Sequence, residues 1–421
     1  MNILTEDTKA IILLCGILGK KASVKPLSQT EYTNLVRWLI NANLRPSSLL
    51  DPEYIKGAAS GSGLDEKRLD TLLGRGTQLG FAVENWQRNG IWVISRSDTD
   101  YPVRYKKHLK EKAPPLLFGV GDRSLLKGGG LAMIGSRNVD AKGEIFTQSM
   151  AKLCAANQMP VVSGGARGVD QISMETALEA HGTSIGILAE SLLKKSLGKS
   201  FRKAIADNRL LLISPYHPEA PFATWAAMGR NKLIYAMADF ALVVSAEHKK
   251  GGTWAGATEE LKRECAIPVF TRIDETIPKG NKMLLDLGAI QWPATFPTLN
   301  MNKFLKSAAD AFLERQKHNN STLFDQAVNQ PKYKVEEKIS ILNPSPEKSE
   351  KKAADPTVPS SVYEAVLPLI LKVLSSPLTP GDLAEKVMVQ KAQMNIWLKQ
   401  AATDGKIKKL TSPVRYKRVE K

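Results

Sequence analysis

Between residues 131 and 170, two short apolar segments each end in a glycine-bearing loop, and a segment with helical spacing lies between them. The first apolar segment, 131–134, is followed by Gly135-Ser136-Arg137, and the second, 160–162, is followed by the loop 163–168. Strand, helix and strand in this order form the βαβ unit of a parallel sheet. Both loops should leave the carboxyl ends of their strands, where open parallel sheets bind ligands.

The glycine and arginine residues of these two loops indicate an anion-binding site. Glycine lets the backbone approach a ligand closely, and the amides at the start of a helix favour a negative charge. Arg137 and Arg167 add guanidinium groups, which match the geometry of phosphate. Arg137 could instead form an ion pair with Asp140 or Glu144, and Arg167 could instead stabilise its own loop. The first hypothesis is therefore a ligand that carries phosphate.

The remainder of the sheet is predicted from further apolar segments that alternate with helical ones. These segments are 183–188, 210–213, 240–244 and 268–270. They predict an α/β protein whose central domain, residues 96–315, is a Rossmann-like doubly wound parallel sheet. Arg230 and Lys232 lie in an apolar helical pattern, so they require either a bound anion or internal carboxylates. The small residues at 249–253 predict a loop before the next helix.

Three further regions flank this domain. Residues 1–95 predict a small helical domain of the SAM or helix-hairpin-helix kind, in which 57–63 should be a loop, either a flexible connector or a phosphate cradle. Residues 316–358 are rich in Lys, Glu, Ser, Asn and Pro, which predicts a disordered linker. Residues 359–421 predict a winged helix with its helix-turn-helix at 379–400. Such modules bind duplex DNA or partner proteins, and the sequence does not decide between the two.

Charge and cysteine usage narrow the class of protein. The chain of 421 residues has a formal net charge of +17. Such an excess favours a polyanionic partner, most commonly nucleic acid, and the alternative is a basic surface without one. The three cysteines are far apart in the sequence and show no metal-site spacing, which favours a reducing cytoplasm. No membrane span, secretion signal, cofactor motif or metal motif is recognised.

These motifs together resemble the DNA-processing protein A (DprA/Smf) family. Its GSR turn, SGGARGxD loop, basic RN segment and small-residue loop correspond here to 135–137, 163–170, 230–232 and 251–253. Ser173-Met174 stand where the family usually has Ala-His, which marks a divergent member. The resemblance implies a non-catalytic homodimer that binds single-stranded DNA, protects it and helps to load the recombinase RecA in natural transformation.

The family pocket predicts which residues contact DNA. They are Gly135, Ser136, Arg137, Ser163, Gly164, Gly165, Arg167, Gly168, Arg230, Asn231, Lys232, Gly251, Gly252 and Thr253. Tyr216, Trp225 and Trp254 could stack on unpaired bases or could pack in the core.

Two other functions stay open at this point. A nucleotide sensor or nucleotide hydrolase of the related LOG-like group, for example in phage defence, is suggested by 251–260, which partly matches that group's PGGxGTxxE loop. Glu259 or Glu260 would then act on the ribose bond of a nucleotide. A scaffold protein, whose winged helix docks a partner, is the third possibility.

Overall fold

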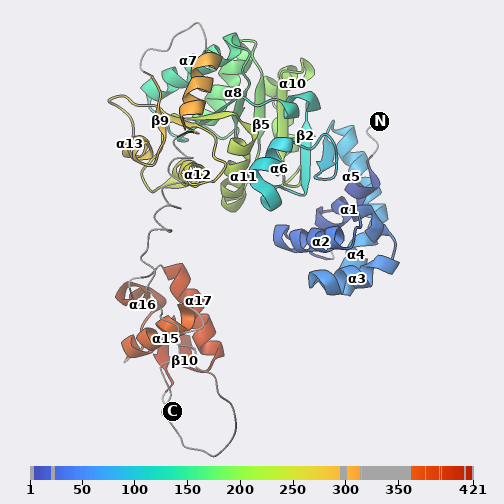
Figure 1. Cartoon of the computed structure of the whole chain (residues 1–421), viewed down its shortest axis with the longest axis vertical. Helices are drawn as coiled ribbons and strands as arrows, with labels where there is room; N and C mark the ends of the chain where they lie inside the picture. The colour runs from blue at the N-terminus through green and yellow to red at the C-terminus, as the bar shows by residue number, and fades with distance from the viewer. Residues whose placement is uncertain are drawn as a thin grey trace, which may run out of the picture. The chain divides into compact units, whose positions relative to one another are not determined.

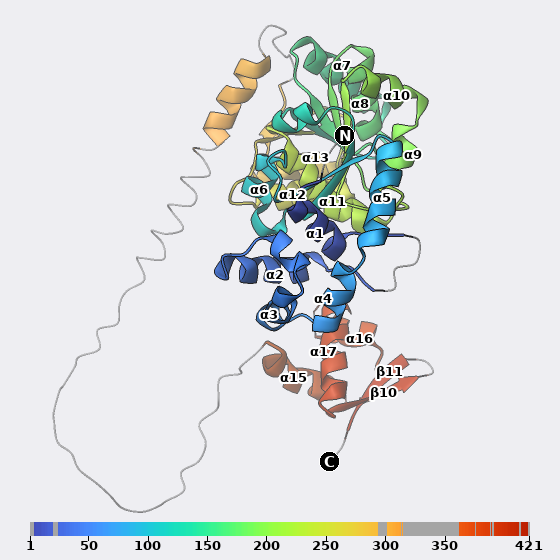
Figure 2. The same ribbon diagram turned by 90° about the vertical axis from the view of Figure 1, so that its right-hand side faces the viewer.

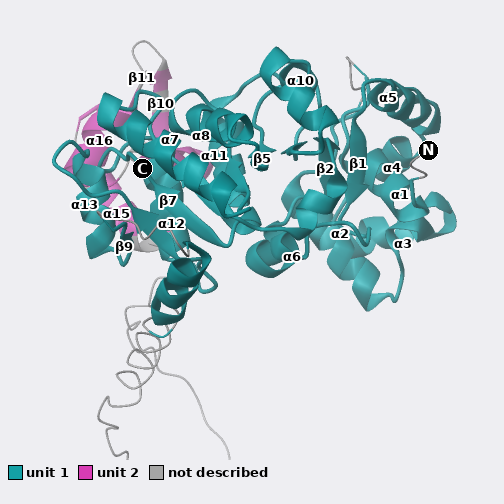
Figure 3. Cartoon of the chain, turned by 90° about the horizontal axis from the view of Figure 1, so that it is seen from above, with its two compact units in different colours: residues 1–331 teal, residues 332–421 magenta. Residues whose placement is uncertain are grey.

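The computed structural model describes residues 4–19, 24–293, 301–312, 314, 362–374, 376–387, 389, 391–411 and 414–419. The chain divides into two compact units, residues 1–331 and residues 332–421, which Figure 3 shows in different colours. The predicted linker at 316–358 lies outside the described residues. The boundary predicted near residue 95 falls inside the first unit and stays a prediction.

The first unit begins with six short helical segments. They are α1 Glu6–Cys15, α2 Gln29–Asn41, η1 Pro46–Leu50, α3 Glu53–Ser62, α4 Glu66–Leu73 and α5 Gly76–Arg88. The loop predicted at 57–63 is wrong, because these residues complete α3. The glycines of α3 have a packing role: a Cβ atom at Gly61 would overlap the indole ring of Trp38 on α2, so glycine lets the two helices approach closely.

A nine-stranded sheet forms the centre of this unit (Figure 1). The strands are β1 Trp92–Ser95, β2 Leu116–Val120, β3 Leu131–Ile134, β4 Val161–Ser163, β5 Ser184–Ile187, β6 Leu210–Ser214, β7 Phe240–Val243, β8 Val269–Thr271 and β9 Ile290–Gln291. Their order is β1-β2-β6-β5-β4-β3-β7-β8-β9. The strands from β6 to β9 in this order are parallel, and β2 and β1 add an antiparallel edge. The predicted doubly wound parallel sheet is confirmed.

Helices cover both faces of the sheet, because its central strands are apolar on both sides. The helices are α6 Val103–Leu109, α7 Ala141–Ala156, α8 Val169–Glu179, α9 Leu192–Ser196, α10 Lys199–Ala206, α11 Thr224–Met237, α12 Gly251–Leu261 and α13 Lys279–Asp286. Met133 of β3 faces the core that α7 and α8 share, whereas Ala132 and Ile134 face the core that α6, α11 and α12 share. The loop predicted at 249–253 is corrected, because α12 already begins at Gly251.

The second unit has the element order of a winged helix (Figure 2). Its elements are α15 Val362–Val373, α16 Pro380–Lys386, α17 Lys391–Thr403, β10 Ile407–Thr411 and β11 Val414–Arg418. The two strands pair antiparallel as the predicted wing, and Leu383, Met394 and Leu398 are in the core beneath it. Within the described ranges, no helix in either unit is both long enough and apolar enough to cross a membrane.

Candidate nucleic-acid interface

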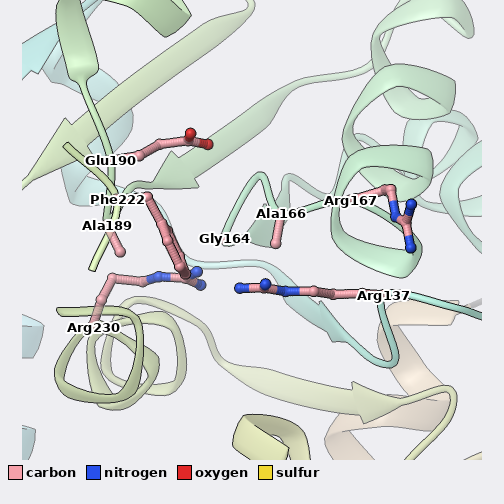
Figure 4. Close-up of a pocket in the computed structure, with 8 residues that line it drawn as sticks. All are labelled: Arg137, Gly164, Ala166, Arg167, Ala189, Glu190, Phe222 and Arg230. Carbon is pink, nitrogen blue, oxygen red and sulfur yellow. The ribbon is translucent and has the colours of Figure 1, made fainter. Parts of the chain in front are cut away.

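Two adjoining cavities, of about 320 and 530 Å³, lie where the loops after the central strands meet. Both are lined by Arg137, Ala166, Phe222 and Arg230, and we call the two together the loop groove. Figure 4 shows the residues that line the first cavity. The groove lies beside β3 and β7, where the strand order of the sheet reverses. Open parallel sheets bind their ligands at such a switch point.

Glycine is required where the loops after β3 and β4 touch. Gly168 has φ +86°, and a Cβ atom there would overlap the carbonyl oxygen of Ser136. Next to it, the backbone amide of Val169 donates a hydrogen bond to the same oxygen at 3.3 Å. Gly164 lies directly against the guanidinium group of Arg230, which would collide with any side chain at position 164. The glycines therefore bring the two loops and the Arg230 side chain together.

Arg230 is a buried cation that is poorly satisfied by the protein. Arg230 is only 4% exposed, and its Nε and Nη1 atoms have no hydrogen-bond partner among the described residues. The nearest acid is Asp170, whose Oδ2 lies 3.8 Å from Nη1, within ion-pair range but too far for a hydrogen bond. Asp170 itself accepts a hydrogen bond from the backbone amide of Gly164 at 3.1 Å. The geometry leaves donor capacity for a ligand with acceptor oxygens.

The pKa shifts of this pair support the same conclusion. Burial raises the pKa of the Asp170 carboxyl, although Arg230 lies beside it. Burial also lowers the pKa of Arg230, and the positive charge of Arg137 lowers it further. Arg137 and Arg230 point toward each other across the first cavity (Figure 4), so an anion between them would relieve their repulsion.

Arg137 is available to a ligand. It is exposed, and its guanidinium carbon lies 5.0 Å from the ring centre of Phe222. Among the described residues it forms no ion pair, and Asp140 instead bonds to Arg272 at 3.2 Å. The alternative role for Arg137, an ion pair with Asp140, is therefore wrong.

Two aromatic side chains lie exposed around the groove. Phe222, which lines both cavities, is 48% exposed, and Trp225 at the start of α11 is 71% exposed. Core packing is therefore excluded for Trp225, which meets the ring of Tyr216 edge-on at 5.4 Å. Trp254 is half-buried and packs against the core. Sequence reasoning missed Phe222, because it counts this residue as the first position of the apolar helical pattern that contains Arg230, whereas α11 begins at Thr224.

The start of α12 closes the second cavity. Gly251, Gly252 and Thr253 line it, and the Thr253 hydroxyl donates a hydrogen bond to the carbonyl of Gly135 at 3.1 Å. Asn231 of α11 lines the same cavity and donates to the carbonyl of Gly252 at 3.1 Å. These bonds hold α11, α12 and the loop after β3 in one arrangement.

Not every predicted site residue reaches the groove. Ser163 is buried and donates a hydrogen bond to the carbonyl of Met133 at 2.6 Å, so it joins strands and does not line either cavity. Gly165 and Gly168 belong to the loop after β4 but line neither cavity. Arg167 lines the first cavity and donates a hydrogen bond to the side chain of Asn138, so it joins the loop after β4 to the loop after β3.

The prediction for Lys232 needs correction. It lies two residues after Arg230 on α11, and residues at this spacing point about 200° apart on a helix. Lys232 accordingly lines neither cavity, and its electrostatic neighbours are Glu259, Lys112 and Arg263. Burial lowers the pKa of Lys232.

The two glutamates of the catalytic alternative also lie away from the groove. Glu260 is buried, with its Oε2 atom 3.0 Å from Nε2 of His108, and its Oε1 atom accepts a hydrogen bond from the amide of Ile267. Glu259 pairs with Arg263 at 2.9 Å. Both glutamates lie two helical turns beyond Gly252 and line neither cavity. The structural basis for nucleotide hydrolysis by these groups is therefore absent from the described groove.

Comparison with known proteins agrees with the motifs. Residues 92–298 match the family described as DNA recombination-mediator protein A. The DNA processing protein DprA of Bacillus subtilis is 28% identical over 189 residues, covering 44% of this chain and 62% of the relative. DprA of Streptococcus pneumoniae is 30% identical over 162 residues, covering 37% of this chain and 56% of the relative. The chain thus spans about three fifths of the length of these curated relatives.

The fold agrees as well. The X-ray structure of DprA from Streptococcus pneumoniae superposes with a TM-score of 0.53 at 20% identity, covering 63% of this chain and 90% of that chain. At this identity the likeness concerns the fold alone. The family match over residues 92–298 and the curated relatives together show that the sheet region of this chain belongs to the DprA/Smf family, as its motifs predict.

Proposed function

We propose that the loop groove binds single-stranded DNA through its sugar–phosphate chain. The observation that carries the proposal is Arg230, a buried guanidinium group with two nitrogen atoms that lack hydrogen-bond partners. Leaving buried donors unpaired is costly, and a phosphate oxygen would satisfy them with charge-assisted hydrogen bonds. Arg137 on the facing wall would contact the same or the next phosphate.

The chemistry of the groove favours a nucleic acid over an isolated anion. The groove consists of two adjoining cavities, and the net charge of +17 favours a polyanion. Membership of a family described as DNA recombination mediators supports DNA as that polyanion.

The aromatic groups favour an unpaired strand. Phe222 presents an exposed ring to the groove, and Trp225 presents another next to Thr224, which lines the second cavity. Bases can stack on such rings only when they are not paired in a duplex. A single strand can also bend so that a phosphate reaches the buried Arg230, whereas a duplex keeps its phosphates on the outside of a stiff rod. We therefore expect single strands to bind more tightly than duplexes.

We extend the proposal to a cellular role through the family relationship. A chain that covers single-stranded DNA would protect it and could present it to a RecA-type recombinase during transformation or recombination in the cytoplasm. We further propose that it acts as a homodimer and carries out no catalysis. Sedimentation of the purified chain would test the dimer, and measuring RecA filament assembly in its presence would test the loading role.

A salt titration tests DNA binding directly. For a single strand, the logarithm of affinity should fall with the logarithm of salt concentration by about 0.7 per phosphate contact. Replacing Arg137 by Ala should weaken binding by about 1.5–3 kcal/mol, the worth of one charge-assisted hydrogen bond. Arg88→Ala, on the exposed side of α5, is the matched control and should bind as the wild type does. A flat salt response would contradict phosphate-mediated binding.

The same assay decides on a second candidate function, a nucleotide sensor. Free nucleoside monophosphates and duplex DNA should be titrated beside the single strand. Tight binding of a nucleotide, with no affinity for the single strand, would favour the sensor and reject our proposal.

A further inference from the structure

Helices α9 and α10 carry a group of cations that no acid neutralises. We call the exposed residues Lys194, Lys199, Arg202 and Lys203 the basic ridge. In the part of the chain that the structure describes, none of the four forms an ion pair, and neither helix has an acidic residue in its first turn. The ridge therefore concentrates positive charge on one surface beyond the loop groove.

The charges on α10 repel one another. Lys199 and Lys203 are four residues apart, and Lys199 and Arg202 are three apart, so both pairs are neighbours on the helix surface. Lys199 and Arg202 also lie in the first turn, where the partial charge of the helix end is already positive. This arrangement is unfavourable in the free protein and becomes favourable when a polyanion lies across it.

The ridge is continuous with the loop groove. A third cavity, of about 390 Å³, is lined by Lys194 and Lys195, and it shares Glu190 with the first cavity of the groove. Glu190 would repel a phosphate at this junction, but Nζ of Lys195 lies 3.1 Å from its Oε1 atom and neutralises it. A chain of phosphates can therefore pass the junction at Glu190. Glu175 also lines the third cavity, where it accepts a hydrogen bond from the side-chain amide of Gln171 at 3.0 Å, and among the described residues it forms no ion pair, so Lys194 and Lys195 must outweigh this one carboxylate.

We propose that the basic ridge is a second contact surface for single-stranded DNA and receives the part of the strand that leaves the loop groove. The inference rests on the proposed function, because it continues the same strand. Lysine contacts phosphate as a flexible point charge, so the ridge binds the backbone without regard to base sequence. It lengthens the bound segment and does not alter the contacts around Arg230.

The length of the DNA separates the ridge from the groove. Oligonucleotides of about 5 nucleotides fill the groove alone, whereas those of about 20 nucleotides also reach the ridge. The test variant combines Lys194→Gln, Lys199→Gln and Lys203→Gln. It should bind the long oligonucleotide about 10-fold more weakly, with a salt slope smaller by about 2, because about three phosphate contacts are lost. Its affinity for the short oligonucleotide should stay within about twofold of the wild-type value.

A second triple variant controls for net charge. Lys56→Gln, Lys67→Gln and Lys152→Gln remove three exposed lysines from α3, α4 and α7. This variant should bind both oligonucleotides as the wild type does. Thermal unfolding curves of both variants verify that each remains folded.

Each other outcome has a distinct meaning. Equal losses with the two triple variants would show that the ridge acts only through overall charge and would overturn the inference. Unchanged binding of the long oligonucleotide by the ridge variant would also overturn the inference. An acidic protein surface would then be the partner to test for the ridge. If the wild type bound neither oligonucleotide, the proposed function itself would have failed.

Discussion

Removing the buried guanidinium group of Arg230 should raise the stability of the chain while lowering its affinity for DNA. The cleanest variant is Arg230→Met with Asp170→Asn, because Arg230→Met alone would leave the buried Asp170 carboxyl without the guanidinium group beside it. Methionine fills a similar volume without charge, and asparagine keeps an oxygen that accepts the hydrogen bond from the amide of Gly164. The two effects of opposite sign distinguish a ligand-binding arginine from a structural one.

The expected magnitudes follow from the contacts of Arg230. Two of its nitrogen atoms are buried without a hydrogen-bond partner, and each such group costs about 1–3 kcal/mol. Replacing a buried ion pair by well-packed neutral groups is often neutral or stabilising by about 1–4 kcal/mol. We therefore expect the free energy of unfolding to rise by about 1–4 kcal/mol. Losing one charge-assisted bond to phosphate should weaken DNA binding by about 1.5–3 kcal/mol, or roughly 10- to 150-fold.

Arg272 provides a matched control. It is as deeply buried as Arg230, but its guanidinium group bonds to Asp140 at 3.2 Å, to Asp274 at 2.6 Å and to the Thr276 hydroxyl at 2.7 Å. Arg272→Met should therefore destabilise the chain by about 1.5–3 kcal/mol, because charge-assisted hydrogen bonds are lost while the two partly exposed carboxylates become solvated. The affinity of its folded fraction for DNA should fall much less than that of the Arg230 variant.

Urea unfolding measures stability, and fluorescence anisotropy with a labelled single strand measures affinity. The reasoning would be refuted if the Arg230 variant lost stability as the Arg272 variant does. It would also be refuted if the Arg230 variant gained stability and still bound DNA with wild-type affinity. In either case the unpaired nitrogen atoms would have no connection to a phosphate ligand.

Three further predictions concern stacking, the loop backbone and acid stability. Phe222→Ala should weaken binding of single-stranded DNA by about 1–3 kcal/mol in the anisotropy assay, whereas Phe222→Trp should retain it, because one stacking surface is lost or kept. Gly168→Ala should lower the urea midpoint more than Gly251→Ala, because both positions have positive φ but only the first would also place Cβ against backbone atoms; equal losses would contradict this. The hydrogen bond from Arg68 lowers the pKa of Glu31 to about 2. The stability from this pair is therefore complete above the unfolded pKa of about 4.3 and is lost as pH falls toward 2, so Glu31→Gln should flatten that part of a urea-midpoint profile.

Much of the fold could be predicted from the sequence because its signals are local. The segment 131–134 is apolar at every position, as a strand buried on both faces must be, and the helix after it shows helical spacing. The loops after β3 and β4 follow from their glycines, which the close approach of Gly168 to Ser136 requires. The winged helix was predicted in the same way from its alternating helical and strand patterns.

The details of the site depended on contacts between distant elements, which local patterns do not contain. Lys232 was assigned to the pocket with Arg230 because the two are close in sequence, although a helix turns them to different sides. The glycines at 57–63 suggest a loop, but Gly57 and Gly61 lie in α3, where they leave space for the ring of Trp38, and Gly63 caps the helix. Phe222 could have been noted as an aromatic residue directly after the proline-rich segment 215–221, but its contact with Arg137 depends on the tertiary fold.

The glycine at position 164 links the sequence motif to the chemistry of the groove. Its φ angle is not positive, so glycine is not required there by the backbone. It is required because a Cβ atom would occupy the place of the Arg230 guanidinium group. A larger residue would force that group out of its buried position, where water could satisfy its nitrogen atoms. The glycine therefore keeps the arginine in a place where water is excluded and where the electrostatic attraction to a phosphate is strongest.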